Sequence, residues 1–529
     1  MCRPQSSEPI SAPTRVINVG PSDGSRTPFL QDSSGEVHEW VTLSHRWGTV
    51  QPLRTTLKTL ASHQAALPME TLPRLFQDAI FITRKMKYQY LWIDSLCIIQ
   101  DSTADWSYEI SRMESIFKYC SFMISAEFCH DSTESIFPSS VDLNYLQQAC
   151  HVTKDGNGGT IAACSSDVRS TANRACGVLR SRAWVLQEDV LSPRTLTWKP
   201  HQLLWDCRRI TRSEAEPSGR LISLAEKIWR SSAALKLVSL PQEMLHTLKQ
   251  QQKYHTNFYE PMALWYTMLE NFCSRQITVK ADSLPAISGI AKEIRKHTGY
   301  NYYAGLWAQD LHNGLLWSTH GVESCRITRP SWSWAAMGNG IRINPAPLVL
   351  LDVRFEFLRP IANVVSVEVT NGGHDEFGLV TSGKLQLQGP CKNMSSCKQA
   401  TIKLPSREQM MFSNDDVSPK RHKIYQGTIC CWLDCCPWKE LDSSSAAAEL
   451  SNRGIVFIQI AAVDQTRNDV FNSMTAYHQE RFEETRAGKT WALILEPAGD
   501  NMIEYRRLGI ARISDELADG WDTQTVIII

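Results

Sequence analysis

The segment Tyr90-Leu91-Trp92-Ile93-Asp94-Ser95-Leu96-Cys97-Ile98-Ile99-Gln100-Asp101 contains an apolar run that stops at a carboxylate. Its first four residues are too few for a helix and are apolar on both faces, as strands covered by helices on each side are. In an open α/β sheet, ligands bind at the carboxyl ends of the strands, where loops converge and helices present their amino ends. We therefore expect Asp94 to lie in a binding site.

Helical patterns flank this predicted strand. Apolar residues recur at helical spacing in two sets, Leu75, Ala79, Ile82 and Met86 before it and Trp106, Ile110, Met113 and Phe117 after it. Short apolar runs at 39–43 and 122–124 predict two further strands. The order strand, helix, strand, helix, strand is typical of a parallel sheet with right-handed crossovers, so the fold class is predicted to be α/β.

The first predicted strand runs directly into Ser44-His45-Arg46-Trp47-Gly48. A hydroxyl, an imidazole, a guanidinium and an indole, closed by a glycine, suit a loop that grips a polar ligand. The alternative is a turn in which Arg46 and Trp47 only stack on each other or on the next domain. Cys97 and Gln100 are added as candidate ligand-binding residues, because they follow Asp94 on the neighbouring loop. We expect Ser44, Arg46 and Asp94 to converge at one edge of the sheet.

Glu109 is a candidate catalytic residue beside Asp94. It lies one position before Ile110 in the second predicted helix, on the flank of the buried face. Glutamate on such a flank is usually only solvated. The helix nevertheless follows the strand that ends at Asp94 and could lean over the same sheet edge.

Glu188 is the third candidate catalytic carboxylate. It lies one helical turn beyond Trp184, in a predicted helix that also contains Gln187. Trp184, Gln187 and Arg194 are candidate ligand-binding residues. The alternative role for Glu188 is a structural salt bridge to Arg182 or Arg194.

Composition narrows the class of protein. A chain of 529 residues is too long for one core, so two or three domains are expected. Apolar residues make up 43 % and charged residues 21 %, as in ordinary globular proteins. Lys+Arg and Asp+Glu both total 55, which argues against nucleic acid as the main partner. Neither a signal peptide nor a membrane span is evident, so we expect a cytoplasmic protein.

The 16 cysteines favour reduced thiols over a disulfide framework, since they are scattered through core-like segments. The densest group is Cys430-Cys431 with Cys435-Cys436. It lacks the CxxC spacing of zinc ribbons and has no histidine between its two pairs. We therefore expect no structural metal.

Three blocks of sequence resemble a known family. WVTLSHRWG (40–48), LWIDSLCIIQ (91–100) with DWSYEISRMESIF (105–117), and AWVLQEDVLSPR (183–194) are similar to the signature blocks of the fungal heterokaryon-incompatibility (HET) domain, in that family's order. The chain departs from the family's pattern at Trp40, Phe117, Ala183 and Ser135.

The resemblance implies a domain distantly related to the Toll/interleukin-receptor (TIR) fold, with a role in non-self recognition and the cell death that follows. It covers residues 39–215 as the HET domain. The residue patterns outside it predict an irregular segment 1–38, a mainly helical region 216–328 and a β-rich domain 329–529. Because some TIR domains cleave NAD, NAD is a possible substrate. Breaking its N-glycosidic bond would need a carboxylate, such as Glu188 or Glu109, to stabilise a cationic ribose.

Two other classes of function stay open. The first is an enzyme of small-molecule metabolism with a pocket between the α/β and β-rich domains, where pockets are frequent. The second is an interaction module without chemistry, which binds a protein partner in incompatibility signalling. The NAD hypothesis is not supported by a phosphate-binding glycine loop. The glycine-rich segment Gly156 to Gly159 follows no recognisable strand, as such a loop would.

Overall fold

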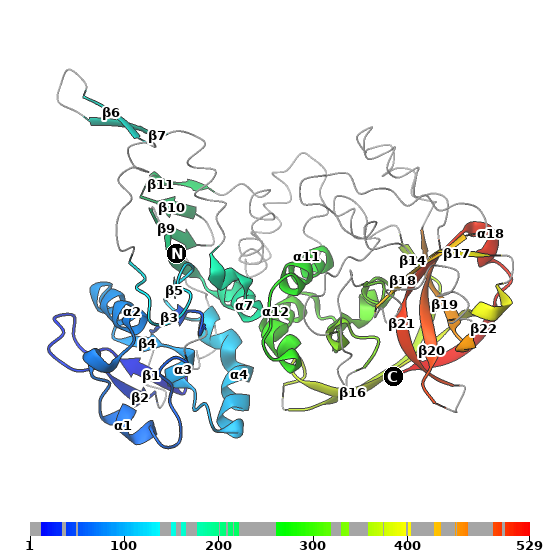
Figure 1. The fold of residues 1–529 in the computed structure, drawn as a ribbon, viewed down its shortest axis with the longest axis horizontal. Helices are drawn as coiled ribbons and strands as arrows, with labels where there is room; N and C mark the ends of the chain where they lie inside the picture. Colours follow the sequence, from blue (N-terminus) through cyan, green and yellow to red (C-terminus); the bar gives the residue numbers. More distant parts are fainter. Residues whose placement is uncertain are drawn as a thin grey trace. The chain divides into compact units, whose positions relative to one another are not determined.

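The computed structural model describes residues 12–33, 39–48, 51–137, 150–154, 160–164, 177–199, 202–207, 210–214, 216–221, 261–318, 330–337, 358–373, 375–397, 400–403, 428–434, 450, 452–463, 490–499 and 503–529. The chain divides into two compact units, Met1–Thr247 and Leu248–Ile529 (Figure 1). Each unit is described by itself.

A nine-stranded sheet forms the centre of the first unit, in the order β11-β10-β9-β8-β5-β3-β4-β1-β2. The strands are β1 (Arg15–Asn18), β2 (Phe29–Asp32), β3 (Val41–Ser44), β4 (Tyr90–Trp92), β5 (Phe122–Ser125), β8 (Arg194–Lys199), β9 (Gln202–Cys207), β10 (Ile210–Ser213) and β11 (Glu216–Leu221). The four central strands β8, β5, β3 and β4 run parallel. Antiparallel strands extend both edges. The predicted parallel core of a mixed α/β domain is therefore confirmed.

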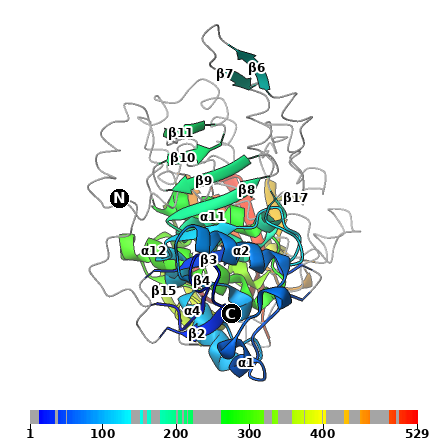
Figure 2. The same cartoon turned by 90° about the vertical axis from the view of Figure 1, so that its left-hand side faces the viewer.

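Helices cover both faces of this sheet. They are α1 (Leu60–Ala65), α2 (Arg74–Lys85), α3 (Asp94–Cys97), α4 (Thr103–Lys118) and α7 (Ala183–Leu191). α2 lies on one face, and α4 and α7 lie on the other (Figures 1 and 2). Burial on both faces explains why every residue of β3 and β5 is buried.

Two helical faces differ from expectation. Met86 was expected on the buried face of α2, but it follows the last turn and is 44 % exposed. In α4 the buried side chains include Glu109, Met113 and Phe117, while Ile110 is only partly buried. The buried stripe of α4 is therefore rotated toward Glu109, which lies inside the domain rather than on its flank.

The N-terminal segment expected to be irregular contains β1 and β2. They pair with each other, and β1 pairs with β4 in the sheet. At the other edge β11 (Glu216–Leu221) also belongs to this sheet, although the helical region was expected to begin at residue 216. β6 (Cys150–Lys154) and β7 (Thr160–Cys164) form a separate antiparallel hairpin.

The second unit combines helices with a closed ring of strands. Its helices are α11 (Pro261–Cys273), α12 (Ser288–Thr298), α13 (Leu311–Gly314) and α18 (Asp515–Ala518), and β12 (Tyr302–Tyr303) pairs with β13 (Leu306–Trp307). The ring consists of β16 (Val380–Asn393), β19 (Val456–Val463), β20 (Thr490–Pro497), β21 (Glu504–Ile513) and β22 (Asp522–Ile528), with β22 pairing back to β16. Four shorter or outer strands are added, β14 (Leu358–Pro360), β15 (Asn363–Asn371), β17 (Thr401–Lys403) and β18 (Thr428–Leu433). The expected β-rich C-terminal region is confirmed.

A boundary between a helical and a β-rich domain was expected near residue 329, but contacts join the two parts. Lys292 of α12 forms an ion pair of 2.8 Å with Asp375, beside the β15–β16 turn. Buried Arg507 of β21 donates hydrogen bonds to the main-chain oxygens of Leu315 and Trp317. The helices and the strand ring therefore form one unit.

Two tryptophans of this unit are buried as expected but lie in a different structure. Trp332 and Trp334 lie two positions apart, so on a strand they would face the same way and pack in the core. The structure places them in a turn that leads into a 3-10 helix, Trp334–Ala336. The apolar run 348–351 has the residue pattern of a strand, but it lies outside the described residues.

Candidate functional site

The candidate site begins where β3 ends, at the centre of the parallel sheet. The chain passes from β3 to β4 on one side and then to β5 on the other, which gives the order β4-β3-β5-β8. Ser44 and Ser125 are level with each other at the carboxyl ends of β3 and β5. Loops that leave two such strands in opposite directions open the crevice in which doubly wound proteins bind ligands.

Ser44 joins this edge to α7. Its hydroxyl donates a short hydrogen bond to Oε2 of Glu188, and both residues are buried. The pKa of Glu188 is raised to about 7, chiefly by burial and also by the Asp94 and Asp189 carboxylates, against the lowering effect of Ser44 and Arg182. Glu188 therefore changes charge near neutral pH.

Asp94 lies beside this pair, at the start of α3. The indole Nε1 of Trp47 donates to Asp94 Oδ2 at 3.0 Å, and the backbone N–H of Ser95 donates to Oδ1 at 2.7 Å. His45 Nδ1 lies 3.6 Å from the same Oδ1. The loop after β3 and the loop after β4 thus meet at one carboxylate.

His45 is an unusual component because its side chain is fully buried. Neither ring nitrogen has a hydrogen-bond partner among the described residues. Burial lowers the pKa of His45, and the Arg182 charge lowers it further, against the opposing effect of Asp94. The imidazole is therefore neutral at pH 7, with polar atoms that a ligand or water can satisfy.

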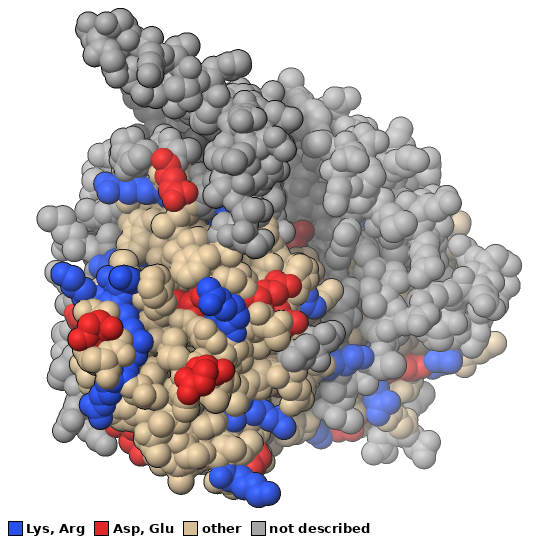
Figure 3. Space-filling view, turned by 60° about the vertical axis from the view of Figure 1, so that its left-hand side comes forward, with Lys and Arg blue, Asp and Glu red and all other residues tan. Residues whose placement is uncertain are grey.

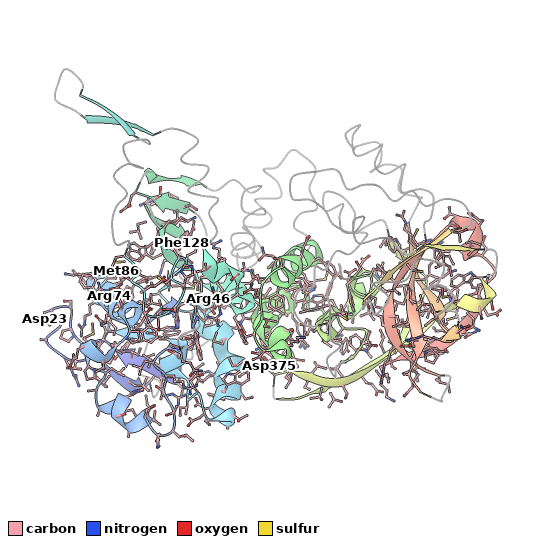
Figure 4. All side chains as sticks on the ribbon, viewed as in Figure 1. Asp23, Arg46, Arg74, Met86, Phe128 and Asp375 are labelled. Atoms are coloured by element: carbon pink, nitrogen blue, oxygen red, sulfur yellow. The ribbon has the colours of Figure 1, made fainter. Side chains whose placement is uncertain are left out.

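Two arginines approach the same edge. Arg182 Nη1 donates to the main-chain oxygen of His45 at 2.6 Å, which ties the start of α7 to the loop after β3. Arg46, labelled in Figure 4, follows His45 in the same loop and is half-buried. No hydrogen bond or ion pair joins Arg46 to any residue that the structure describes. Its guanidinium is thus available to an anionic ligand.

Gly48 closes the loop for a steric reason. Its φ angle is +71°, and a Cβ atom there would lie 2.4 Å from Cβ of Asp131 and 2.6 Å from the oxygen of His130. Any larger residue would push the loop away from the segment after β5, so only glycine fits.

Gln100 and Cys97 support the loop. The Gln100 side-chain amide donates to the main-chain oxygens of Asp94 and Ile98, at 3.0 and 3.1 Å. Cys97 is buried, and burial raises the pKa of its thiol to about 12, so it is no thiolate nucleophile at neutral pH. These two candidates fix the backbone that carries Asp94.

The other candidate residues of the sequence block 183–194 lie in two different places. Gln187 is buried and Trp184 is partly buried, both on α7 with Glu188. Arg194 starts β8, which runs parallel to β5, so it lies at the opposite, amino-terminal edge of the sheet. There it donates to the main-chain oxygen of Ser121 at 2.8 Å. The structure therefore does not bring Arg194 to the site.

Glu109 belongs to a separate buried network. It is fully buried, and its Oε1 lies 3.9 Å from Nη2 of Arg15. Burial raises its pKa, with Arg15 among the groups that oppose this. Arg15 also binds both carboxylate oxygens of Asp105, at 2.5 and 2.6 Å. Glu109 thus faces β1 and acts as part of the framework.

Sequence reasoning missed Glu127. This buried glutamate follows β5 by two residues and accepts hydrogen bonds on its side chain from Gly177 N–H and on its main chain from Leu179 N–H. Its Oε1 lies 3.1 Å from Nε of Arg180, which also approaches Asp189 at 3.8 Å. A carboxylate just beyond a short apolar strand was the signal, the same pattern that singled out Asp94.

The described residues contain neither the side-chain arrangement of a metal site nor a membrane-spanning helix. Among the described residues, no group of three His, Cys, Asp or Glu side chains is arranged to hold a metal ion. Cys430 and Cys431 are buried, and Cys435 and Cys436 lie outside the described residues. None of the described helices has the length and apolar character of a membrane span. Acidic and basic side chains lie side by side over the described surface in Figure 3.

Comparison with known proteins places this site in a family. Residues 40–188 match the family described as heterokaryon incompatibility protein (HET), and that range contains every member of the cluster from Ser44 to Glu188. No curated protein and no solved structure matches the chain. The matched range contains the first two sequence blocks and the first half of the third, which runs from 183 to 194. The chain therefore contains a HET domain of the heterokaryon-incompatibility type.

Proposed function

We propose that this HET domain is a cytoplasmic effector of programmed cell death in fungal non-self recognition, and that it cleaves the N-glycosidic bond of NAD. The proposal rests mainly on one observation. Glu188, a buried carboxyl group with a pKa of about 7, is held by Ser44 at the carboxyl end of a central parallel strand.

The chemistry suits a carboxylate in this position. The bond between nicotinamide N1 and ribose C1′ breaks, and its electron pair leaves with nicotinamide, which becomes neutral. Positive charge develops on the ribose until water adds to C1′ and releases a proton to solvent. An ionised Glu188 stabilises that charge, as carboxylates do in glycoside hydrolysis.

Neighbouring groups supply contacts for the rest of a nucleotide. Arg46 offers a guanidinium to phosphate oxygens, which it can bind in a bidentate manner. His45 offers buried ring nitrogens to a hydroxyl or a carbonyl group. Because no glycine-rich phosphate loop follows a strand among the described residues of the first unit, phosphate recognition would depend on these side chains.

The choice of NAD comes from the suggested relationship to the TIR fold, some members of which cleave NAD. The strand order β4-β3-β5-β8 is consistent with this choice, since doubly wound sheets of this order bind nucleotides at the switch point between strands equivalent to β3 and β5.

The test is release of nicotinamide from NAD by the purified full chain, followed by chromatography. Glu188→Gln keeps the shape of the side chain and removes its charge. We expect the rate to fall by about 100-fold or more with folding retained, as when a key electrostatic group is lost. The wild-type rate should rise between about pH 6 and 8, because only ionised Glu188 stabilises the cation.

Glu70→Gln is the matched control, because Glu70 is exposed and far from the strand ends in sequence. It should leave the rate unchanged. A wild-type chain that releases no nicotinamide, or a Glu188→Gln variant with the wild-type rate, would contradict the proposal.

A further inference from the structure

β15 (Asn363–Asn371) is an outer strand with one unpaired edge. It pairs with β16 alone among the described strands. Val364 and Val365 are 45 % and 52 % exposed, which is uncommon for β-branched side chains. An exposed edge strand presents a row of free N–H and C=O groups to another chain.

The strand contains few of the features that normally block edge pairing. Natural edge strands are protected by lysines, prolines, bulges or short length. The segment Asn363–Asn371 is nine residues long and contains no Lys, Arg or Pro. The register with β16 shifts twice, between Val364 and Ser366 and between Thr370 and Asn371, so a bulge or irregularity lies near each end of the strand. The first contributes to the exposure of Val364 and Val365, and the strand from Ser366 to Thr370 is regularly paired on its inner side.

Two ion pairs join the β15–β16 hairpin to α12. Its turn is anchored to α12 by Lys292–Asp375 at 2.8 Å and by Arg295–Glu376 at 2.5 Å (Figure 4). An edge that is already extended loses less conformational entropy when it binds.

The sequence of β15 is complementary to itself. In an antiparallel pair centred on Val367, Val365 would face Val369 of the other copy, and Ser366 would face Glu368. Asn363 would face Asn371, and Val364 would face Thr370, so no like charges stand directly opposite each other. Lys384, the cross-strand neighbour of Glu368 on β16, balances the one charge of the strand.

We propose that β15 is a homodimer interface, at which two copies of this chain pair their β15 strands antiparallel about a two-fold axis through Val367. A two-fold contact uses the same patch on both copies, which is what a self-complementary strand provides. A single strand pair buries a small area, so the dimer should be weak, with a dissociation constant in the range of roughly 1 to 100 µM.

Sedimentation of the full chain from about 1 to 200 µM tests the proposal, a range chosen to span that affinity. In the proposed pairing Ser366 faces Glu368 of the other copy, so a negative and a positive charge at position 366 should change the dissociation constant in opposite directions. Ser366→Glu would place glutamate opposite Glu368 twice in each dimer, and Ser366→Lys would place lysine there instead. We expect the dissociation constant to rise roughly fivefold in the first variant and to fall by a similar factor in the second, as expected for cross-strand charge pairs.

Ser382→Glu is the matched control, because Ser382 is an exposed residue on β16 and not on the pairing strand. It should leave the dissociation constant unchanged, and circular dichroism should be unaltered in all three variants. A chain that stays monomeric throughout the concentration range would overturn the proposal. So would a dimer that responds equally to Ser366→Glu and Ser366→Lys, because it would be formed by another surface.

Discussion

Burial of Glu188 lowers the free energy of unfolding at neutral pH. Burial favours the protonated carboxyl group, so the folded state binds a proton that the unfolded chain has already released at neutral pH. The shift from 4.5 to about 7 corresponds to about 3 kcal/mol. Such a cost is common where a group is placed for function rather than for stability.

This cost gives a prediction with a defined sign. Because the folded pKa is raised, the stabilising effect of protonation is complete below pH 4.5 and is lost as pH rises to about 7. At pH 8 the free energy of unfolding of Glu188→Gln should therefore exceed that of the wild type by up to about 3 kcal/mol, as measured by urea unfolding. The difference should shrink as the pH falls toward 4.5. Glu70→Gln should show no such pH-dependent gain. Equal stability of Glu188→Gln and wild type at pH 8 would mean that the carboxylate is not desolvated.

At the scale of the element, β1 fixes the loop that carries Asp94. It lies outside the range that matches the HET family, but its Arg15 reaches into the domain. Arg15 Nε donates to the main-chain oxygen of Cys97 at 2.8 Å, and its guanidinium pairs with Asp105 in the first turn of α4. Together these bonds join the sheet edge to both helices that follow β4.

Arg15→Met should therefore destabilise the domain by up to about 3 kcal/mol, because it removes a buried guanidinium and leaves the partly buried Asp105 carboxylate without its counter-charge. Urea unfolding followed by circular dichroism measures the change. Arg54→Met is the control, since Arg54 is exposed, and it should shift the stability by less than about 0.5 kcal/mol. Similar stability of the two variants would show that β1 is dispensable.

At the scale of the whole molecule, two units divide the chain near residue 247. The second is held together by Arg507, which is 1 % exposed and pairs with Asp434 at 2.8 Å. Its guanidinium also stacks on the Trp317 ring, with 3.4 Å to the centroid. One side chain thus connects β21, the end of β18 and the segment after α13.

Replacing this arginine should loosen distant segments together. In Arg507→Met, amide hydrogen exchange should quicken in both 311–318 and 504–513, because a buried pair broken on one side costs about 3 to 5 kcal/mol. Arg506→Met is a matched control at the next position, where the side chain is exposed. Faster exchange confined to β21 would mean that Arg507 does not couple the helices to the strand ring.

The sequence by itself determined the local elements of the first unit. Alternating and helical patterns located β3, β4, β5 and α4, and the carboxylate after an apolar run identified Asp94 as a residue at a strand end. Such patterns are readable because they depend on neighbours along one element. The family blocks then grouped the right three segments, and the match over residues 40–188 supports that grouping.

Only the tertiary structure decided which side chains meet. Ser44 and Glu188 are 144 positions apart, and nothing in either segment specifies their hydrogen bond. Arg194 lies at the far edge because β8 runs parallel to β5; in an antiparallel strand the same residue would have stood beside Ser125. Strand direction, register and helix rotation are set by packing between elements distant in sequence, and a local pattern does not contain that information.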